Sequence, residues 1–257
     1  MTDQDSLIQF NPWQQLRAHT PARIALGRVG SSLPTTEVLL FGLEHARARD
    51  AVHRPLDINA LINELQREGF RTSHVRSKAP DRQTYLVRPD LGRRLHEESR
   101  RQLENEPGAP RLAVVTADGL SSIAVQNHAV PVLKLLREEF PADWSLTPIV
   151  VAEQGRVALG DDIGEALNAE LVVVMIGERP GLTSPDSLGL YITFRPHVGC
   201  MDSERNCISN IRPEGLSYVQ AAHKLAYLMR EAMRRGLTGL GLKDDSGLKA
   251  LGADDYA

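Results

Sequence analysis

Cysteine is scarce in this chain, with only Cys200 and Cys207 among 257 residues. Two cysteines cannot form the disulfide framework that stabilises many small secreted proteins. Long apolar runs are also lacking, because no stretch approaches the roughly 20 residues that a membrane-spanning helix needs. The first seven residues do not show the basic and then apolar pattern of a signal peptide. The sequence therefore predicts a soluble, cytoplasmic protein with no membrane partner.

An excess of basic charge is missing as well. The formal net charge is −3, and basic and acidic residues are mixed along the chain. This balance argues against a nucleic-acid partner, which would require a clustered basic face. The densest basic spots are the arginine pairs at 93–94 and 100–101, but Glu97, Glu98 and Glu104 lie among them. We interpret this segment as the solvated face of one helix.

Two parts of the chain differ in pattern. Residues 106–110 contain two prolines and a glycine and cannot continue a helix, so they form the best domain boundary. We predict a smaller, mainly helical N-terminal domain over residues 1–106 and a second domain over residues 107–236. Glycine and aspartate recur in residues 237–257, for which we predict a mobile tail.

Four helices are expected before this boundary. They are a short helix over residues 12–19, one from Thr35 or Thr36, one capped by Asp57 and stopped by Gly69, and one from about Asp90 to Leu103. The second helix has an apolar face made of Val38, Leu39, Leu43 and Ala46. Residues 74–76 and 84–87 are expected to be short extended pieces.

Strands and helices alternate after the boundary. Apolar runs at residues 112–115, 148–152, 171–176 and 188–194 predict strands. Helical patterns reach Phe140, start again at Asp161 or Asp162, and run from Ser217 to Gly236. This alternation predicts βαβ units. The expected fold class is therefore α/β, with a Rossmann-like, mostly parallel sheet flanked by helices.

The run LVVVMI at residues 171–176 is apolar throughout and mostly β-branched, which predicts a strand buried on both faces. It leads directly into GERPGL at residues 177–182, and the polar run 205–211 follows some thirty residues later. The loop after a buried strand opens at the carboxyl edge of the sheet, where open α/β sheets bind ligands. We predict that both segments are ligand loops.

Three residues at strand ends or in turns are candidate site residues. Glu178 is a carboxylate directly after a buried strand, which is costly without a partner, so it either contacts a ligand or forms a surface ion pair with Arg179. Asp118 ends the first strand and is expected to face the ligand crevice, although no Gly-x-Gly-x-x-Gly string indicates a dinucleotide site. Val157 is an apolar residue in a turn, for which core packing is the default.

The cysteines do not define a metal site. Together with His197 they offer three ligands, so a structural zinc ion would lack its fourth. A nucleophilic thiol would need a base nearby, and the spacing of residues in the sequence does not identify one. Cys207 is therefore either a small buried residue or a soft wall of a ligand pocket. We predict no metal site and no catalytic residue in this chain.

Five motifs, in order and spacing, resemble the small subunit (light chain) of ethanolamine ammonia-lyase. They are YLVRPDLGRRL at residues 85–95, DGLS at 118–121, GRV at 155–157, GERPGL at 177–182 and CISNI at 207–211. The resemblance covers roughly residues 23–236. It implies a hetero-oligomer with a large (β/α)₈-barrel subunit that binds ethanolamine and converts it by radical rearrangement to acetaldehyde and ammonia.

The resemblance also implies a cofactor, adenosylcobalamin, and names Val157, Glu178 and Cys207 as its contacts in this chain. The Asp-x-His-x-x-Gly string of proteins that replace the benzimidazole of cobalamin with histidine does not occur. We therefore expect base-on binding. An alternative from another class is a free-standing α/β binding module for a nucleotide-like ligand. Enteric members carry a longer N-terminal extension, so location in a bacterial microcompartment is a weaker expectation than the cytoplasm.

Overall fold

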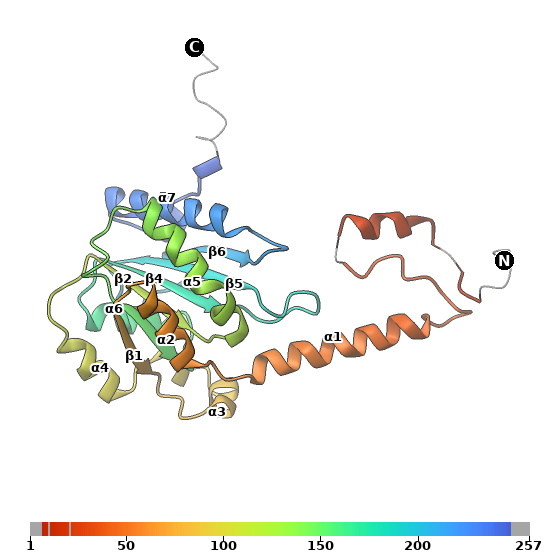
Figure 1. Ribbon diagram of the computed structural model, residues 1–257, viewed down its shortest axis with the longest axis horizontal. Coiled ribbons are helices and arrows are strands. Elements are labelled where there is room, and N and C mark those ends of the chain that lie inside the picture. The colour runs from red at the N-terminus through yellow and green to blue at the C-terminus, as the bar shows by residue number, and fades with distance from the viewer. Residues whose placement is uncertain (1–6, 10, 21, 248–257) are drawn as a thin grey trace, which may run out of the picture.

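A computed structural model of the chain describes residues 7–9, 11–20 and 22–247. Its centre is a six-stranded sheet with the strand order β1-β3-β2-β4-β5-β6 (Figure 1). The strands are β1 (Thr72–Arg76), β2 (Leu112–Ala117), β3 (Ile149–Glu153), β4 (Leu171–Gly177), β5 (Leu188–Phe194) and β6 (Asn206–Ile211). The first four in this order are parallel, whereas β5 runs antiparallel to both β4 and β6. The predicted α/β class with a mostly parallel sheet is confirmed.

Helices cover both faces of the sheet (Figure 1). α2 (Ile58–Arg67), α5 (Ser122–Glu139) and α7 (Tyr218–Arg235) pack on one face, and α4 (Glu97–Glu104) and α6 (Leu159–Ala166) lie on the other. Every residue of β4 is buried between these two layers, which explains its unbroken apolar sequence. The predicted start of α2 and the predicted end of α7 are confirmed, since Asp57 caps the N-terminus of α2 and Gly236 ends α7 in the left-handed conformation.

The N-terminal part of the chain is largely helical. It contains a 3₁₀ helix (Pro12–Ala18), α1 (Thr35–His53), α2, α3 (Arg82–Val87), a 3₁₀ turn (Leu91–Arg93) and α4. The sheet does not begin at the predicted boundary at residue 107, because β1 precedes that boundary and pairs with β3.

Two predictions in this part are wrong. Residues 84–87 are helical rather than extended, because the side chain of Asp81 accepts a hydrogen bond from the Thr84 amide and starts α3. The helix predicted from Asp90 is two separate pieces. Leu95 between them is extended, forms a bridge to Ser77 and donates its amide to the carboxylate of Asp162.

The arginines of the segment 93–101 do not all form a solvated face. Arg94 Nε lies 3.0 Å from Asp162, and Arg100 also pairs with this aspartate, whose side chain is buried. Asp161 and Asp162 do not cap a helix as predicted, but lie inside the first turn of α6 and are both buried. These ion pairs fasten α4 to α6.

The C-terminal end has its own packing as far as it is described. A 3₁₀ turn (Gly239–Gly241) follows α7, and Leu242 beyond it is buried. The side chain of Asn206 accepts from the Gly239 amide at 2.8 Å and donates to the Leu242 carbonyl at 2.8 Å. Residues 237–242 of the predicted tail therefore pack against β6, and residues 248–257 lie outside the described part.

Candidate functional site

Glu178 follows β4 at the carboxyl edge of the sheet. Its Oε2 atom accepts a hydrogen bond from the Ser187 hydroxyl and another, at 3.2 Å, from the Asn210 amide. Ser187 precedes β5 and Asn210 lies in β6, so the carboxylate joins the ends of three neighbouring strands. The structure shows no ion pair between Glu178 and Arg179. The surface-pair interpretation of Glu178 is therefore wrong.

The second oxygen of this carboxylate lies over Gly189. A Cβ atom at position 189 would lie only 3.0 Å from Glu178 Oε1, so the absence of a side chain there makes room for the carboxylate. Among the described residues we find no hydrogen bond to Oε1. Two donors thus fix the orientation of Glu178, while one charged acceptor stays available to a ligand.

Tyr191 and Cys207 lie beside this carboxylate on adjacent strands. They are paired in the register of β5 and β6. Desolvation by neighbouring atoms raises the pKa of the Cys207 thiol, and the charge of Glu178 raises it further. The thiol is therefore neutral at pH 7, as expected for the wall of a ligand site and not for a nucleophile.

Val157 lies on the same side of the sheet. It packs, together with Tyr191, against the apolar cluster formed by the α6-facing side chains of β2, β3 and β4. It also lines a depression of about 390 Å³ with Arg93, Arg156, Cys200, Met201 and Arg205. Side chains alternate along a strand, which places Glu178, Gly189, Tyr191 and Cys207 on this α6 side as well. The three residues predicted as cofactor contacts therefore share one face of the sheet.

Arg205 holds the loop between β5 and β6, which borders this face. Its Nη1 atom lies 2.6 Å and 2.7 Å from the two carboxylate oxygens of Asp161, and its Nη2 atom donates to the Cys200 carbonyl at 2.6 Å. Burial raises the pKa of Asp161 to about 6, against the opposing charge of Arg205. The predicted ligand loop 205–211 is not a loop, since residues 206–211 form β6.

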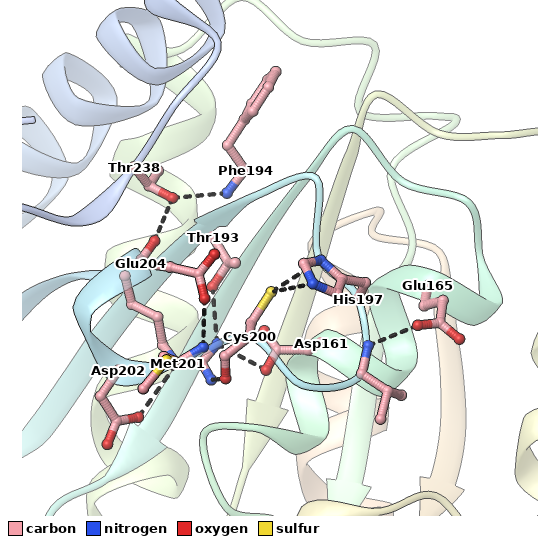
Figure 2. Close-up of polar contacts among 12 residues, drawn as sticks. Asp161, Glu165, Thr193, Phe194, His197, Cys200, Met201, Asp202, Glu204 and Thr238 are labelled. Carbon is pink, nitrogen blue, oxygen red and sulfur yellow. Dashed lines mark hydrogen bonds and ion pairs between the residues drawn. The ribbon is translucent and has the colours of Figure 1, made fainter. Parts of the chain in front are cut away.

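Cys200 and His197 both lie in this loop between β5 and β6. The Cys200 sulfur lies 3.2 Å from His197 Nδ1 (Figure 2). No cluster of three or more His, Cys, Asp or Glu side chains suited to a metal ion occurs in the part of the chain that the structure describes. Burial raises the pKa of the Cys200 thiol. The structure thus places beside this thiol a base that spacing alone did not identify, although burial disfavours the thiolate that a nucleophile requires.

Asp118 does not face a ligand crevice, contrary to the prediction. It is buried, and its carboxylate accepts from Arg82 Nη1 at 3.1 Å and from the Gly155 amide at 2.9 Å. Burial raises the pKa of Asp118 to about 6. The turn after β2 packs closely on the end of β4, because a Cβ atom on Gly119 would lie 2.2 Å from the Gly177 carbonyl oxygen.

A buried histidine also has a structural role. His128 in α5 contacts the Tyr218 hydroxyl at 2.8 Å through Nδ1 and Asp186 at 3.3 Å through Nε2. With both ring nitrogens engaged, His128 fastens the segment before β5 to α5 and α7. Sequence reasoning missed this trio, because its members are 58 and 90 residues apart.

Sequence reasoning also missed the groups that complete the site around Glu178. Ser187, Gly189 and Tyr191 belong to no local motif, and Asn210 was noted only as part of the CISNI motif and not as a partner of Glu178. Because side chains alternate along a strand, the sequence of residues 188–194 could have placed Gly189 and Tyr191 on one face. It could not have shown that β6 lies beside them.

The fold and the site together define a Rossmann-like α/β protein with an oriented carboxylate on one sheet face and no catalytic acid–base pair among the residues described. The chain belongs to the ethanolamine ammonia-lyase light chain family, whose model matches residues 10–243. This membership makes it an ammonia-lyase subunit and confirms the resemblance seen in the sequence.

Relatives in several bacteria share most of this chain. A protein of Azotobacter vinelandii named ethanolamine ammonia-lyase small subunit is 61% identical over 241 residues, which cover 92% of this chain and 89% of the relative. A protein of the same name in Pseudomonas syringae pv. tomato is 55% identical over 259 residues, covering 99% of this chain and 90% of the relative. Among the described residues, no helix combines the length and apolar character required to cross a bilayer.

Proposed function

We infer that this chain is the small subunit of an adenosylcobalamin-dependent ethanolamine ammonia-lyase, which converts ethanolamine to acetaldehyde and ammonia. In this role it helps to hold the cobalamin at the interface with a large catalytic subunit. The observation that carries the proposal is the oriented carboxylate of Glu178. Its Oε2 atom is held by Ser187 and Asn210, and its Oε1 atom lies over Gly189 without a partner among the described residues.

The residues on this face suit a cobalamin. The corrin ring is broad and largely apolar, and amide groups surround its rim. Amide N–H groups are donors that suit a fixed carboxylate acceptor, and a hydrogen bond to a charged group is stronger than a neutral one. Val157, Tyr191 and Cys207 add apolar and polarisable surface beside Glu178. These four residues would hold the cofactor on the α6 side of β4, β5 and β6.

Chemistry and binding are divided between the subunits in this proposal. When bound, adenosylcobalamin supplies the radical that removes a hydrogen atom from the substrate. This chain supplies orientation and shields one side of the cofactor from water. The buried carboxylates Asp118, Asp161 and Asp162 are all engaged with arginines, which leaves them unsuited to proton transfer. The acid–base groups therefore belong to the large subunit.

Co-production with the cognate large subunit tests the proposal. We expect the two chains to purify together, and the complex to show a cobalamin absorption spectrum and release ammonia from ethanolamine after addition of the cofactor. A free-standing module for a nucleotide-like ligand would instead purify alone and without a cobalamin spectrum. Failure of the two chains to associate would refute the proposed function.

A further inference from the structure

Exposed apolar side chains are concentrated at the N-terminal end of the chain. Of the seventeen large hydrophobic side chains that are exposed in the described residues, eleven belong to residues 7–43. Leu39 in α1 is 68% exposed and Trp13 in the preceding 3₁₀ helix is 67% exposed. Soluble proteins rarely leave so many apolar side chains together in water unless a partner covers them.

These residues form an arm, which we define as residues 7–9, 11–20 and 22–53. Figure 1 shows α1 extending away from the sheet, with the preceding segment folded back beside it. The far end of α1 is anchored, where Ala51 is buried and Arg82 Nε donates to the Val52 carbonyl at 2.7 Å. The apolar face predicted for α1, with Leu39 and Leu43, is exposed and not packed on the sheet.

The arrangement of charged and apolar side chains in the arm is the reverse of that in a solvent-exposed helix. Its ion pairs lie between α1 and the returning segment, where Arg17 lies 3.0 Å from Glu37 and Arg23 lies 2.8 Å from Glu44. Glu37 is buried by these contacts. Charges thus hold the arm together internally, while leucine side chains point outward. A solvated helix has the opposite arrangement.

The charge of the arm indicates the kind of surface that would cover it. The arm contains five arginines and three acidic residues. All three acids already take part in ion pairs, whereas none involves Arg28 or Arg47 among the described residues. Two such arms would bring an excess of positive charge together, which disfavours a second copy of this chain as the occupant.

We propose that the arm docks into an apolar groove with an acidic rim on the large subunit, and that it is a principal anchor of the small subunit in the complex. This inference rests on the proposed function, which supplies the partner. Apolar side chains of α1 fill the groove, and Arg28 and Arg47 face the acidic rim. The arm is a surface separate from the face that carries Glu178.

Amide hydrogen exchange and a matched set of variants test the docking. In the complex of full-length chains, we expect the amides of residues 35–50 to exchange at least tenfold more slowly than in the free small subunit. The double variant Leu39→Glu, Leu43→Glu keeps helix-forming residues but places charges in the groove. It should bind the large subunit about a hundredfold more weakly, the effect expected when two central apolar contacts are lost.

Two further variants separate the details. Leu240→Glu makes the same change at an exposed leucine outside the arm and should bind normally. Arg47→Glu should weaken binding about tenfold if the rim is acidic. Circular dichroism of each free variant confirms that the helices are kept.

The possible outcomes are distinct. Unchanged exchange of residues 35–50, or normal binding by the double leucine variant, overturns the docking while leaving the proposed function in place. Self-association of the free chain that the double variant abolishes would assign the arm to a second copy and also overturn it. If the wild-type chain does not bind a large subunit, the proposed function fails first.

Discussion

Replacing Glu178 with glutamine tests the oriented carboxylate directly. The donors from Ser187 and Asn210 require an acceptor at the Oε2 position. The glutamine oxygen will therefore take that position, which places the amide NH₂ over Gly189. An acceptor that faces the ligand becomes a donor, and its charge is lost. A hydrogen bond to a charged group contributes about 1.5–3 kcal/mol, so we expect cobalamin affinity to fall roughly ten- to a hundredfold.

The assay is a titration of adenosylcobalamin into the assembled enzyme, followed by its absorption spectrum. Glu214→Gln is the matched control. This glutamate follows β6 near the same edge, but its side chain is exposed and forms a weak ion pair with Arg212, at the long distance of 3.8 Å. The control should bind as the wild type does. Both variants should keep the wild-type circular dichroism, since Glu178 contributes little to the core. An unchanged dissociation constant for Glu178→Gln, with the fold intact, would refute its role as a cofactor contact.

Three other predictions follow from the buried groups and from the sequence. Asp118 keeps its proton more tightly in the folded state, with a pKa of about 6, so its contribution to stability falls as pH rises from about 4 to 6 and is constant above. Urea denaturation at several pH values should show this slope in the wild type relative to Asp118→Asn, and parallel profiles would contradict it. Asp162→Ala removes the buried partner of Arg94 and Arg100 and should lower the free energy of unfolding by about 3 kcal/mol. Urea denaturation at pH 7 measures this loss. A loss under about 1 kcal/mol would contradict the prediction and mean that water solvates both arginines. If cobalamin binds base-on, electron paramagnetic resonance of the reduced complex should show coupling to a labelled benzimidazole nitrogen, and absence of this coupling would argue for a histidine ligand.

The inner strands β2, β3 and β4 were predictable from the sequence because they are buried on both faces. Residues 171–176 are apolar without interruption. A run this short, with glycine and proline after it, fits a strand better than a helix or a loop. β6 was missed because it is not buried on both faces. It is an outer strand with polar residues such as Asn206 and Ser209, and such a sequence cannot be distinguished from a loop without its partner strand.

The candidate site was only partly predictable. Glu178 stood out because a carboxylate after a buried strand needs a partner, yet its partners Ser187 and Asn210 come from other strands. Cys207 and Val157 were identified by family resemblance and not by physical pattern, and their contact with a cofactor stays a prediction, as does the cytoplasmic or microcompartment location. Asp118 was misjudged, because the arginine that neutralises it comes from 36 residues earlier in the chain.

Asp161 and Asp162 have a consequence for the order in which the chain folds. The ion-pair partners of these adjacent residues of α6 lie in opposite directions along the sequence. Asp161 pairs with Arg205, 44 residues later, and Asp162 pairs with Arg100 and Arg94, 62 and 68 residues earlier. Contacts between distant residues carry a large loop-closure cost and form slowly. We expect α6 to dock after β2, β3 and β4 have assembled, which would give substitutions at both aspartates φ-values near zero. They should therefore accelerate unfolding and leave the folding rate almost unchanged.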